Sequence, residues 1–428
     1  MLRARQLAGY SAPALPLAAL YFPVFVYLAP FYAAERGVGL WELGTLFIAV
    51  RLVDAFSDPL MGWVSDRVKT PWGRRRVWLA ISVPLVCLSS WMLFAPPADA
   101  GFGHVALWLT ALTLSWTIAL TPYFAWGAEM SGDYVQRARV TAWREAASLI
   151  GTVVAVVIYN TANGADAGLT GVALLVCVGL PIAAVAALGL ADEPRDHSKE
   201  RQPILPALQA ILANAYFRRL LAAYFVNGLA NALPAGLFLF FIGDLLNAPD
   251  AGWLLLLYFV AAIAAMPVWS WAARRLSKHR AWGWAMVYAS VLFAPAIFLG
   301  EGDIWLFTAI TLLTGLALGA DLSLPSAIQA DVVDHDTANS GEQRTGVFFA
   351  LWSVATKAAL ALAGGAALII LDWSGFEAGG ENGEAALWTL AALYALAPAI
   401  LKLLAVALMW NFPLGEAEQR RLRAEIET

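Results

Sequence analysis

Two aspartates, Asp54 and Asp58, lie in a stretch that is otherwise apolar enough to cross a bilayer, VRLVDAFSDPLMGWVSDR. A spacing of four residues places both carboxylates on one face of a helix, about one turn apart. Two carboxylates at that distance repel each other, so one must take a proton or a cation must lie between them. Because charges inside a bilayer mark functional sites, the pair predicts a site for Na+ or a proton.

Two basic residues bear on this site. Arg51 is three residues before Asp54 and on the same face. A structural alternative is an Arg51–Asp54 pair with Asp58 capping a kink at Pro59, although one arginine cannot neutralise both acids. Lys357 lies in FALWSVATKAALAL, which holds no acid at helical spacing. We expect Lys357 to pair with Asp54 or Asp58, and snorkelling to the membrane surface is the alternative.

Further charged residues are candidates for substrate binding. Asp321 is another acid in an apolar segment, and either serves substrate or proton or lies beside water. Arg144 could reach an anionic or hydroxylated substrate, and the alternative is a salt bridge to Glu129. Adjacent residues point about 100° apart on a helix, so we do not expect Arg144 to pair with Glu145. The aromatic residues Trp116, Phe124 and Trp352 could stack on a sugar or pack in the core.

The composition is that of a membrane protein. Of 428 residues, 61% are hydrophobic and only 14% are charged, whereas soluble domains hold about 25% charged residues. The two cysteines and four histidines show no disulfide or metal-ligand pattern. No paired nucleophile and base and no nucleotide loop is present, so we expect neither an enzyme nor an organic cofactor, and no nucleic-acid partner.

Apolar runs of spanning length predict the elements that carry these residues. Long runs without period-two alternation indicate helices, so the fold class is an all-α membrane protein. Twelve spans are expected: 8–34, 40–66, 77–96, 104–130, 141–161, 168–191, 216–245, 250–274, 281–300, 303–329, 346–372 and 385–411. Arginine and lysine gather in the even-numbered loops and both tails, which places both termini in the cytoplasm.

The longest polar connection, 192–215, falls at the middle of the chain. It predicts a six-helix bundle over 1–191, a linker, and a second bundle over 216–428. Basic loops follow Pro59 and, at an offset of about 208 residues, Pro267. Such parallel repeats are the plan of the major facilitator fold, in which substrate binds near the midplane between the halves. A plain gene duplication would predict the same fold.

A basic loop motif follows the two aspartates. Gly62–Trp–Val–Ser–Asp66–Arg67 and Gly73–Arg74–Arg75 resemble the major facilitator loop motif G-x-x-x-D-R-x-G-R-R with a four-residue insertion. Its ion pairs would lock a cytoplasmic gate, and plain topogenic charge is the alternative. The predicted gate residues are Asp66, Arg67, Arg74, Arg75, Glu129 and Arg139.

Three stretches together resemble one family within this superfamily, the glycoside–pentoside–hexuronide:cation symporters that include the melibiose permease. They are RLVDAFSDPLMGWVSDR with WGRRR, TPYFAWGAEMSGDYVQRARVTAWREAASLIG, and ADVVDHDTANSGEQRTGVFFALWSVATK. The resemblance implies that Asp54 and Asp58 hold Na+, Li+ or a proton, that Lys357 tunes the site, and that Arg144 helps bind sugar.

The chain departs from the melibiose permease at its sugar site. Leu120 replaces an acid before Pro122, and Thr121 beside it joins the predicted cation residues. Phe124 replaces a tryptophan. The sugar-binding acid of the first span has no counterpart, because the stretch from Gly9 to Ala34 contains no carboxylate. The cation site is therefore kept and the galactoside site is not, which leaves lysophospholipid carriers of the wider family as relatives in function.

These features predict a monomeric multi-pass protein of the plasma (cytoplasmic or inner) membrane. Its expected function is symport of a sugar, a glycoside or a related small polar solute with Na+ or H+. An amphipathic lipid carrier and an uncoupled uniporter are the alternatives.

Overall fold

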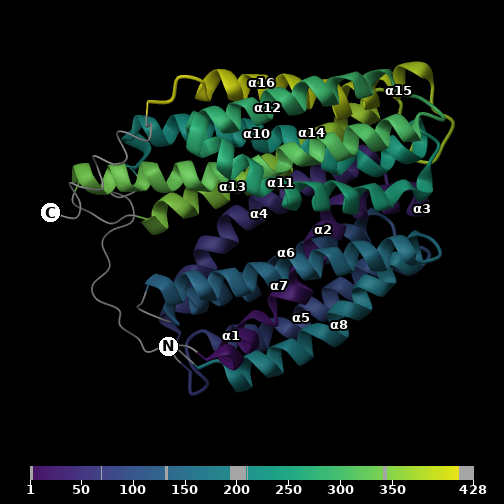
Figure 1. Ribbon diagram of the computed structural model, residues 1–428. Helices are drawn as coiled ribbons and strands as arrows, with labels where there is room; N and C mark the ends of the chain where they lie inside the picture. The colour runs from purple at the N-terminus through teal and green to yellow at the C-terminus, as the bar shows by residue number, and fades with distance from the viewer. Residues whose placement is uncertain are drawn as a thin grey trace. The chain divides into compact units, whose positions relative to one another are not determined.

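The computed structural model describes residues 3–68, 70–130, 134–192, 209, 211–340 and 345–413. Every regular element in these ranges is a helix, which confirms the all-α fold class (Figure 1). The chain divides into two compact units, Met1–Ser198 and Lys199–Thr428. Residues 193–208 and 210 of the predicted linker lie outside the described residues, and the predicted domain limits stay predictions.

The first unit consists of helices that match the first six predicted spans. They are α1 (Ala4–Ser11), α2 (Ala14–Val26), α3 (Leu28–Arg36), α4 (Leu40–Arg67), α5 (Arg76–Phe94), α6 (Phe102–Glu129), α7 (Tyr134–Thr161) and α8 (Ala165–Leu190).

The first predicted span, 8–34, is not one continuous helix. It is divided into α1, α2 and α3, with Pro13 at the start of α2 and Tyr27 at the junction with α3. Proline cannot donate a backbone hydrogen bond and its ring crowds the preceding turn, so Pro13 and Pro23 interrupt the helical ladder. The prediction of a single helix was wrong in this detail.

The second unit has longer helices with short irregular turns at several ends. They are α10 (Ala215–Phe240), η1 (Phe241–Leu245), η2 (Pro249–Trp253), α11 (Leu254–Leu276), α12 (Lys278–Phe293), η3 (Ala294–Phe298), α13 (Ile304–Ser340), α14 (Thr345–Trp373), α15 (Glu384–Ala391), η4 (Ala392–Leu396) and α16 (Ala397–Met409).

Helix α13 extends well past the predicted span 303–329, to Ser340. The sequence after Pro325 has no glycine or proline before Gly341, so nothing stops the helix there. Asp331 and Asp336, which the sequence predicted to lie in a loop, are therefore helical.

Ten segments of the described chain are long and apolar enough to cross a membrane. Helices α4 and α7 are each 28 residues long but do not meet that criterion. In α4 the reason is the charge of Arg51, Asp54 and Asp58 in the middle of the helix. The count of twelve spans and the location of the termini stay predictions.

Small residues allow the closest helix contacts. A Cβ atom added to Gly315 or Gly319 of α13 would lie 2.7 Å from the Tyr258 carbonyl oxygen or 2.5 Å from that of Ala262, both on α11. The two glycines form a G-x-x-x-G pattern, which lets membrane helices approach at backbone distance. In the first unit, Gly151 of α7 packs similarly against Leu15 of α2.

Candidate functional site

The predicted acids of α4 meet α6 at one hydroxyl group. Thr117 Oγ1 lies 3.3 Å from Asp54 Oδ1 and 3.0 Å from Asp58 Oδ1. Asp54 and Thr117 are each 5% exposed, so the contact is buried. Helix α4 thus brings both carboxylates, one turn apart, to the same point on its neighbour. We call Asp54, Ser57, Asp58 and Thr117 the α4–α6 oxygen cluster.

The Thr117 hydroxyl faces two carboxylates. A threonine hydroxyl carries one hydrogen, so Thr117 can donate to only one of the two carboxylates at a time. Ser57 Oγ lies 3.4 Å from Thr117 Oγ1 and 3.4 Å from the Asp54 carbonyl oxygen. Carboxylate and hydroxyl oxygens are the ligands that hard cations prefer. Among the described residues, no three His, Cys, Asp or Glu side chains form a larger metal cluster.

Arg51 contacts the second carboxylate oxygen of Asp54. Its Nη1 atom lies 2.9 Å from Asp54 Oδ2, and the two side chains are 17% and 7% exposed. The ion pair that we considered as a structural alternative is therefore present. This pair involves Asp54, and Asp58 contacts Thr117 Oγ1 through its own Oδ1 atom.

Thr117 is the residue that sequence reasoning missed, and Thr121 was predicted in its place. The Thr121 methyl group lies near Gly62, 3.8 Å from where a Cβ atom on that glycine would be. Thr117 and Thr121 are four residues apart and share one face of α6. The sequence signal, a hydroxyl residue in an apolar helix, is the same for both. Only the register of α6 against α4 distinguishes them.

Arg144 of α7 lies over the Phe124 ring of α6, with its guanidinium carbon 4.4 Å from the ring centroid. Its Nη2 atom also lies 2.6 Å from Glu145 Oε1. The expectation that these neighbours would not pair was wrong, because two long side chains can curl around the helix although their Cβ atoms diverge. The alternative pairing with Glu129 is not seen. Glu145 is 57% exposed, so this ion pair is easily exchanged.

Trp116 packs edge-on against Tyr21 of α2, with ring centroids 5.6 Å apart. Its indole N–H is buried and has no hydrogen-bond acceptor within the described part of the chain. An orphan donor of this kind is costly to bury. The predicted substrate residues Trp116, Phe124 and Arg144 therefore all lie in the first unit.

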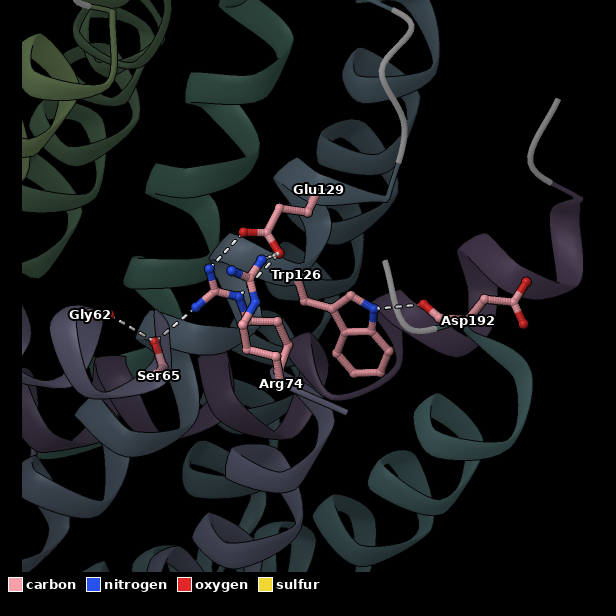
Figure 2. A network of polar contacts seen from close by, with 7 residues as sticks. Gly62, Ser65, Arg74, Trp126, Glu129 and Asp192 are labelled. Atoms are coloured by element: carbon pink, nitrogen blue, oxygen red, sulfur yellow. Dashed lines mark hydrogen bonds and ion pairs between the residues drawn. The ribbon is translucent and has the colours of Figure 1, made fainter. Parts of the chain in front are cut away.

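The predicted gate residues form a cluster around Glu129 at the end of α6 (Figure 2). Arg75 donates to Glu129 from Nε and Nη2 at 3.2 and 2.6 Å, and Arg74 Nη2 lies 2.9 Å from the same carboxylate. Arg75 Nη1 also donates to Ser65 Oγ at 2.8 Å, and Ser65 bonds the Gly62 carbonyl at 3.1 Å. The cluster joins the end of α4, the start of α5 and the end of α6.

The other predicted gate residues are placed differently. Arg67 lies over the Trp63 ring, 4.1 Å from its centroid. Arg139 lies on α7 and is half-buried, and the side chain of Asp66 lies outside the described residues. Nearby, Trp126 Nε1 donates to the Asp192 carbonyl at 2.9 Å and ties the end of α6 to the segment after α8 (Figure 2).

Asp321 is buried in the second unit within a polar network. Lys402 Nζ of α16 lies 2.8 Å from Asp321 Oδ2, and the two side chains are 10% and 6% exposed. Trp282 Nε1 donates to Asp321 Oδ1 at 2.7 Å, and Asn231 Nδ2 donates to Oδ2 at 3.1 Å. Lys402 therefore does not snorkel to the membrane surface, because Asp321 holds it inside the bundle.

The remaining predicted residues lie on α14. Trp352 stacks on Tyr224 of α10 with ring centroids 3.7 Å apart, and the Tyr224 hydroxyl lies 2.9 Å from Thr356 Oγ1. Lys357 follows Thr356 and is half-buried. Because Lys357 and the α4 acids belong to different units, their pairing stays a prediction.

Long apolar helices with charged clusters buried between them define the chain as a multi-pass α-helical membrane protein. It matches the family described as MFS/sugar transport protein over residues 9–416, where MFS is the major facilitator superfamily. The chain therefore belongs to this family, whose members are transporters and not enzymes. The predicted resemblance to glycoside:cation symporters is confirmed.

Two relatives illustrate the range of the family. The chain is 24% identical to the "Putative glycoside/cation symporter YagG" of Escherichia coli, covering 87% of this chain and 84% of the relative. It is also 24% identical to the human "Sodium-dependent lysophosphatidylcholine symporter 1", covering 91% and 79% of the two chains.

Among solved structures, the nucleoside transporter NupG superposes with a TM-score of 0.68, covering 95% of this chain and 99% of that chain. At 11% sequence identity this similarity concerns the fold alone.

Proposed function

We propose that the chain is a cation-coupled symporter that moves a sugar, a glycoside or a related small polar solute together with Na+ or H+. The observation that carries the proposal is the Thr117 hydroxyl between the Asp54 and Asp58 carboxylates. A shared hydroxyl with one hydrogen leaves an oxygen cluster to which a monovalent cation or a proton is the natural addition.

The three charged residues in the middle of α4 favour a single coupling cation. Arg51 contributes one positive charge, and Asp54 and Asp58 contribute two negative charges, so their sum is one net negative charge. One Na+ or one proton would balance it. Lys357 is the predicted competitor for the same charge, so the cation and the lysine ammonium would neutralise the acids in turn. This exchange could bias the two halves between their states.

The substrate would bind beside this cluster in the first unit. Phe124 lies seven residues after Thr117 on the same face of α6, about 10 Å along the helix axis. Arg144 over Phe124 offers guanidinium donors next to an aromatic surface. The orphan Trp116 indole offers a further donor one residue from Thr117. A hydroxyl-rich or anionic solute would satisfy these groups. Trp352 and Asp321 are the substrate-binding residues predicted for the second unit.

The cluster around Glu129 fits the predicted gate. Its arginines are held by a carboxylate that is 28% exposed, so water can reach Glu129 when the ion pairs open. We place this end of the first unit at the cytoplasmic side of a twelve-span protein with both termini in the cytoplasm. Transport would follow alternating access in the plasma or inner membrane, by a monomer that needs no cofactor besides the coupling cation.

A lysophospholipid is the second candidate substrate. The relative named as a lysophosphatidylcholine symporter is as similar in identity as the glycoside relative. Phe124 is 46% exposed beneath Arg144, so an apolar surface adjoins a cation that could hold a phosphate. Leu120 and the absence of a carboxylate between Gly9 and Ala34 also favour this candidate over a galactoside.

The coupling is tested by thermal stability in NaCl, LiCl and choline chloride across a range of pH. We expect wild-type protein to be stabilised by Na+ or by acid, and Asp58→Asn to lose that response while still inserting into the membrane. Asp166→Asn is the matched control, since Asp166 pairs with Arg36 and is 56% exposed. An unchanged response in Asp58→Asn would refute the site.

The substrate is tested by uptake into proteoliposomes with a cation gradient. A panel of glycosides and glucuronides is compared with lysophosphatidylcholine, and Arg144→Gln is compared with Arg36→Gln. Uptake of one class that depends on the gradient and on Arg144 selects that class. Uptake that ignores the gradient would make the chain a uniporter and refute the coupling.

A further inference from the structure

The Asp321 network lies where four helices of the second unit meet. Lys402 Nζ bonds Asp321 Oδ2 at 2.8 Å and Asn227 Oδ1 at 2.9 Å. Asn231 and Trp282 donate to the same carboxylate at 3.1 and 2.7 Å. The side chains come from α10, α12, α13 and α16, so every contact lies within one unit. The site is separate from the α4–α6 oxygen cluster.

The repeat indicates that the fold does not require an acid here. Asp321 stands four residues before Pro325 in α13, and the residue four before Pro122 in α6 is Ile118. An apolar side chain therefore suits the corresponding position of the first unit. A buried ion pair is also a poor way to gain stability, because desolvation of both charges offsets their attraction.

The surroundings of the Lys402 ammonium are those of a bound cation. Its two bonded partners are a carboxylate oxygen and an amide oxygen, which are hard-cation ligands. The carboxylate is oriented by Trp282 and Asn231, which leave Oδ2 directed at the ammonium. The ammonium is a compact charge on a flexible stem, and it is covalently tethered.

We propose that Lys402 is a resident cation, which fills a monovalent-cation site formed by Asp321 and Asn227 in the second unit. Because the ammonium cannot diffuse away, this carboxylate is neutralised without exchanging an ion with the bath. Lys402 then determines specificity by excluding a second coupling ion. The limit of one coupling ion per cycle rests on the proposed function, whereas the occupancy of the Asp321 site does not.

The test removes the Lys402 side chain with its ammonium group. It is done in an Asp58→Asn background, in which the proposed site on α4 is disabled. Lys402→Ala is compared with Lys402→Ala/Asp321→Asn, which lacks both the ammonium and the carboxylate. Melting temperature is measured in choline, sodium and methylammonium chlorides at equal ionic strength. We expect Na+ or methylammonium to raise the Tm of Lys402→Ala in proportion to the logarithm of its concentration, and to leave the double variant unchanged.

Bound cation is counted in parallel by equilibrium dialysis with radioactive sodium. With Asp58 intact, Lys402→Ala should bind one more Na+ than wild type, whether wild type binds one Na+ or couples to protons and binds none. The proposed function can therefore fail, by showing no cation response in wild type, while this gain remains.

Equal responses of the single and double variants to every cation would overturn the inference. Lys402→Ala could fail to fold because it strands the Asp321 carboxylate. Purification that succeeds only in sodium or methylammonium would support the site. If it fails in every salt, Lys402→Gln is measured instead, since its amide can still donate to Asp321, and a lack of cation response there would also overturn the inference.

Discussion

Replacement of Thr117 by valine removes one oxygen from the α4–α6 oxygen cluster and keeps nearly the same shape. Thr117 Oγ1 touches Asp54 Oδ1 at 3.3 Å and Asp58 Oδ1 at 3.0 Å. The other hydroxyl of the cluster, Ser57 Oγ, lies 3.4 Å from Thr117 Oγ1 and donates to the Asp54 backbone carbonyl at 3.4 Å. The variant therefore tests whether the contact between α4 and α6 is part of a cation site.

The size of the effect follows from the chemistry of the contact. A hydrogen bond to a charged group contributes about 1.5–3 kcal/mol. Each 1.4 kcal/mol is about a factor of ten in affinity. If the hydroxyl serves the cation-loaded state, Thr117→Val should weaken the apparent cation affinity about 10- to 100-fold.

The assay is the concentration of Na+ that gives half of the maximal stabilisation in a thermal shift, with Li+ and pH series beside it. Ser115→Ala is the matched control. Ser115 is 3% exposed, lies two residues away on α6, and bonds the Leu112 carbonyl of its own helix at 2.9 Å. It should leave the affinity within about twofold of wild type, since it does not reach the carboxylates.

Equal affinities in Thr117→Val and wild type would refute the reasoning, provided that wild type responds to a cation. A loss that is the same in Ser115→Ala would also refute it, because the effect would then come from packing in α6. Thr121→Val gives a further contrast, since Thr121 lies against Gly62 and should behave like the control.

Three further predictions concern stability and are measured as Tm in detergent. Arg75→Ala should cost about 3 kcal/mol, because it breaks a nearly buried ion pair with Glu129. Arg67→Ala should cost about 1 kcal/mol or less, since Arg67 covers the Trp63 ring at the surface. Equal losses of stability in the two variants would contradict this prediction. Gly151→Ala should be strongly destabilising, because its Cβ would lie 2.0 Å from the Leu15 carbonyl oxygen, while Gly103→Ala meets nothing within 4 Å and should be neutral or stabilising. Asp321→Asn should cost about 3–5 kcal/mol by stranding the Lys402 ammonium, and Asp303→Asn at an exposed turn should cost less than about 1 kcal/mol. A tolerated Asp321→Asn would show that the network does not hold its four helices together.

What could be predicted from the sequence was local. Asp54, Asp58 and Arg51 lie within eight residues of one helix, so the helical period alone places them on one face. Helix limits were predicted well where apolar runs end at glycine or proline, and poorly at Ser340, where no such signal stops α13. The prediction of one continuous helix over 8–34 was wrong because Pro13 and Pro23 interrupt the hydrogen bonds of this apolar run.

Contacts between helices were beyond such reasoning. Thr117 and Thr121 lie four residues apart on the same face of α6, and a shift of about 6 Å along the axis would exchange them. That shift is set by packing against α4, for which the sequence holds no rule. Lys402 and Asp321 are likewise 81 positions apart, and no period connects them.

The two polar clusters differ in the groups that contact their carboxylates, and we propose that this difference makes only the cluster on α4 suitable for cation exchange. Asp321 receives bonds from an indole, an amide and an ammonium, each with its own hydrogen. Asp54 and Asp58 of α4 both contact the Thr117 hydroxyl, which has one hydrogen to donate, and Asp54 also pairs with the Arg51 guanidinium. A saturated network resists change because any displacement leaves a buried group without a partner. We therefore propose that the exchanging cation binds on α4, where one hydroxyl contacts two carboxylates, and that the Lys402 ammonium of α16 stays in place.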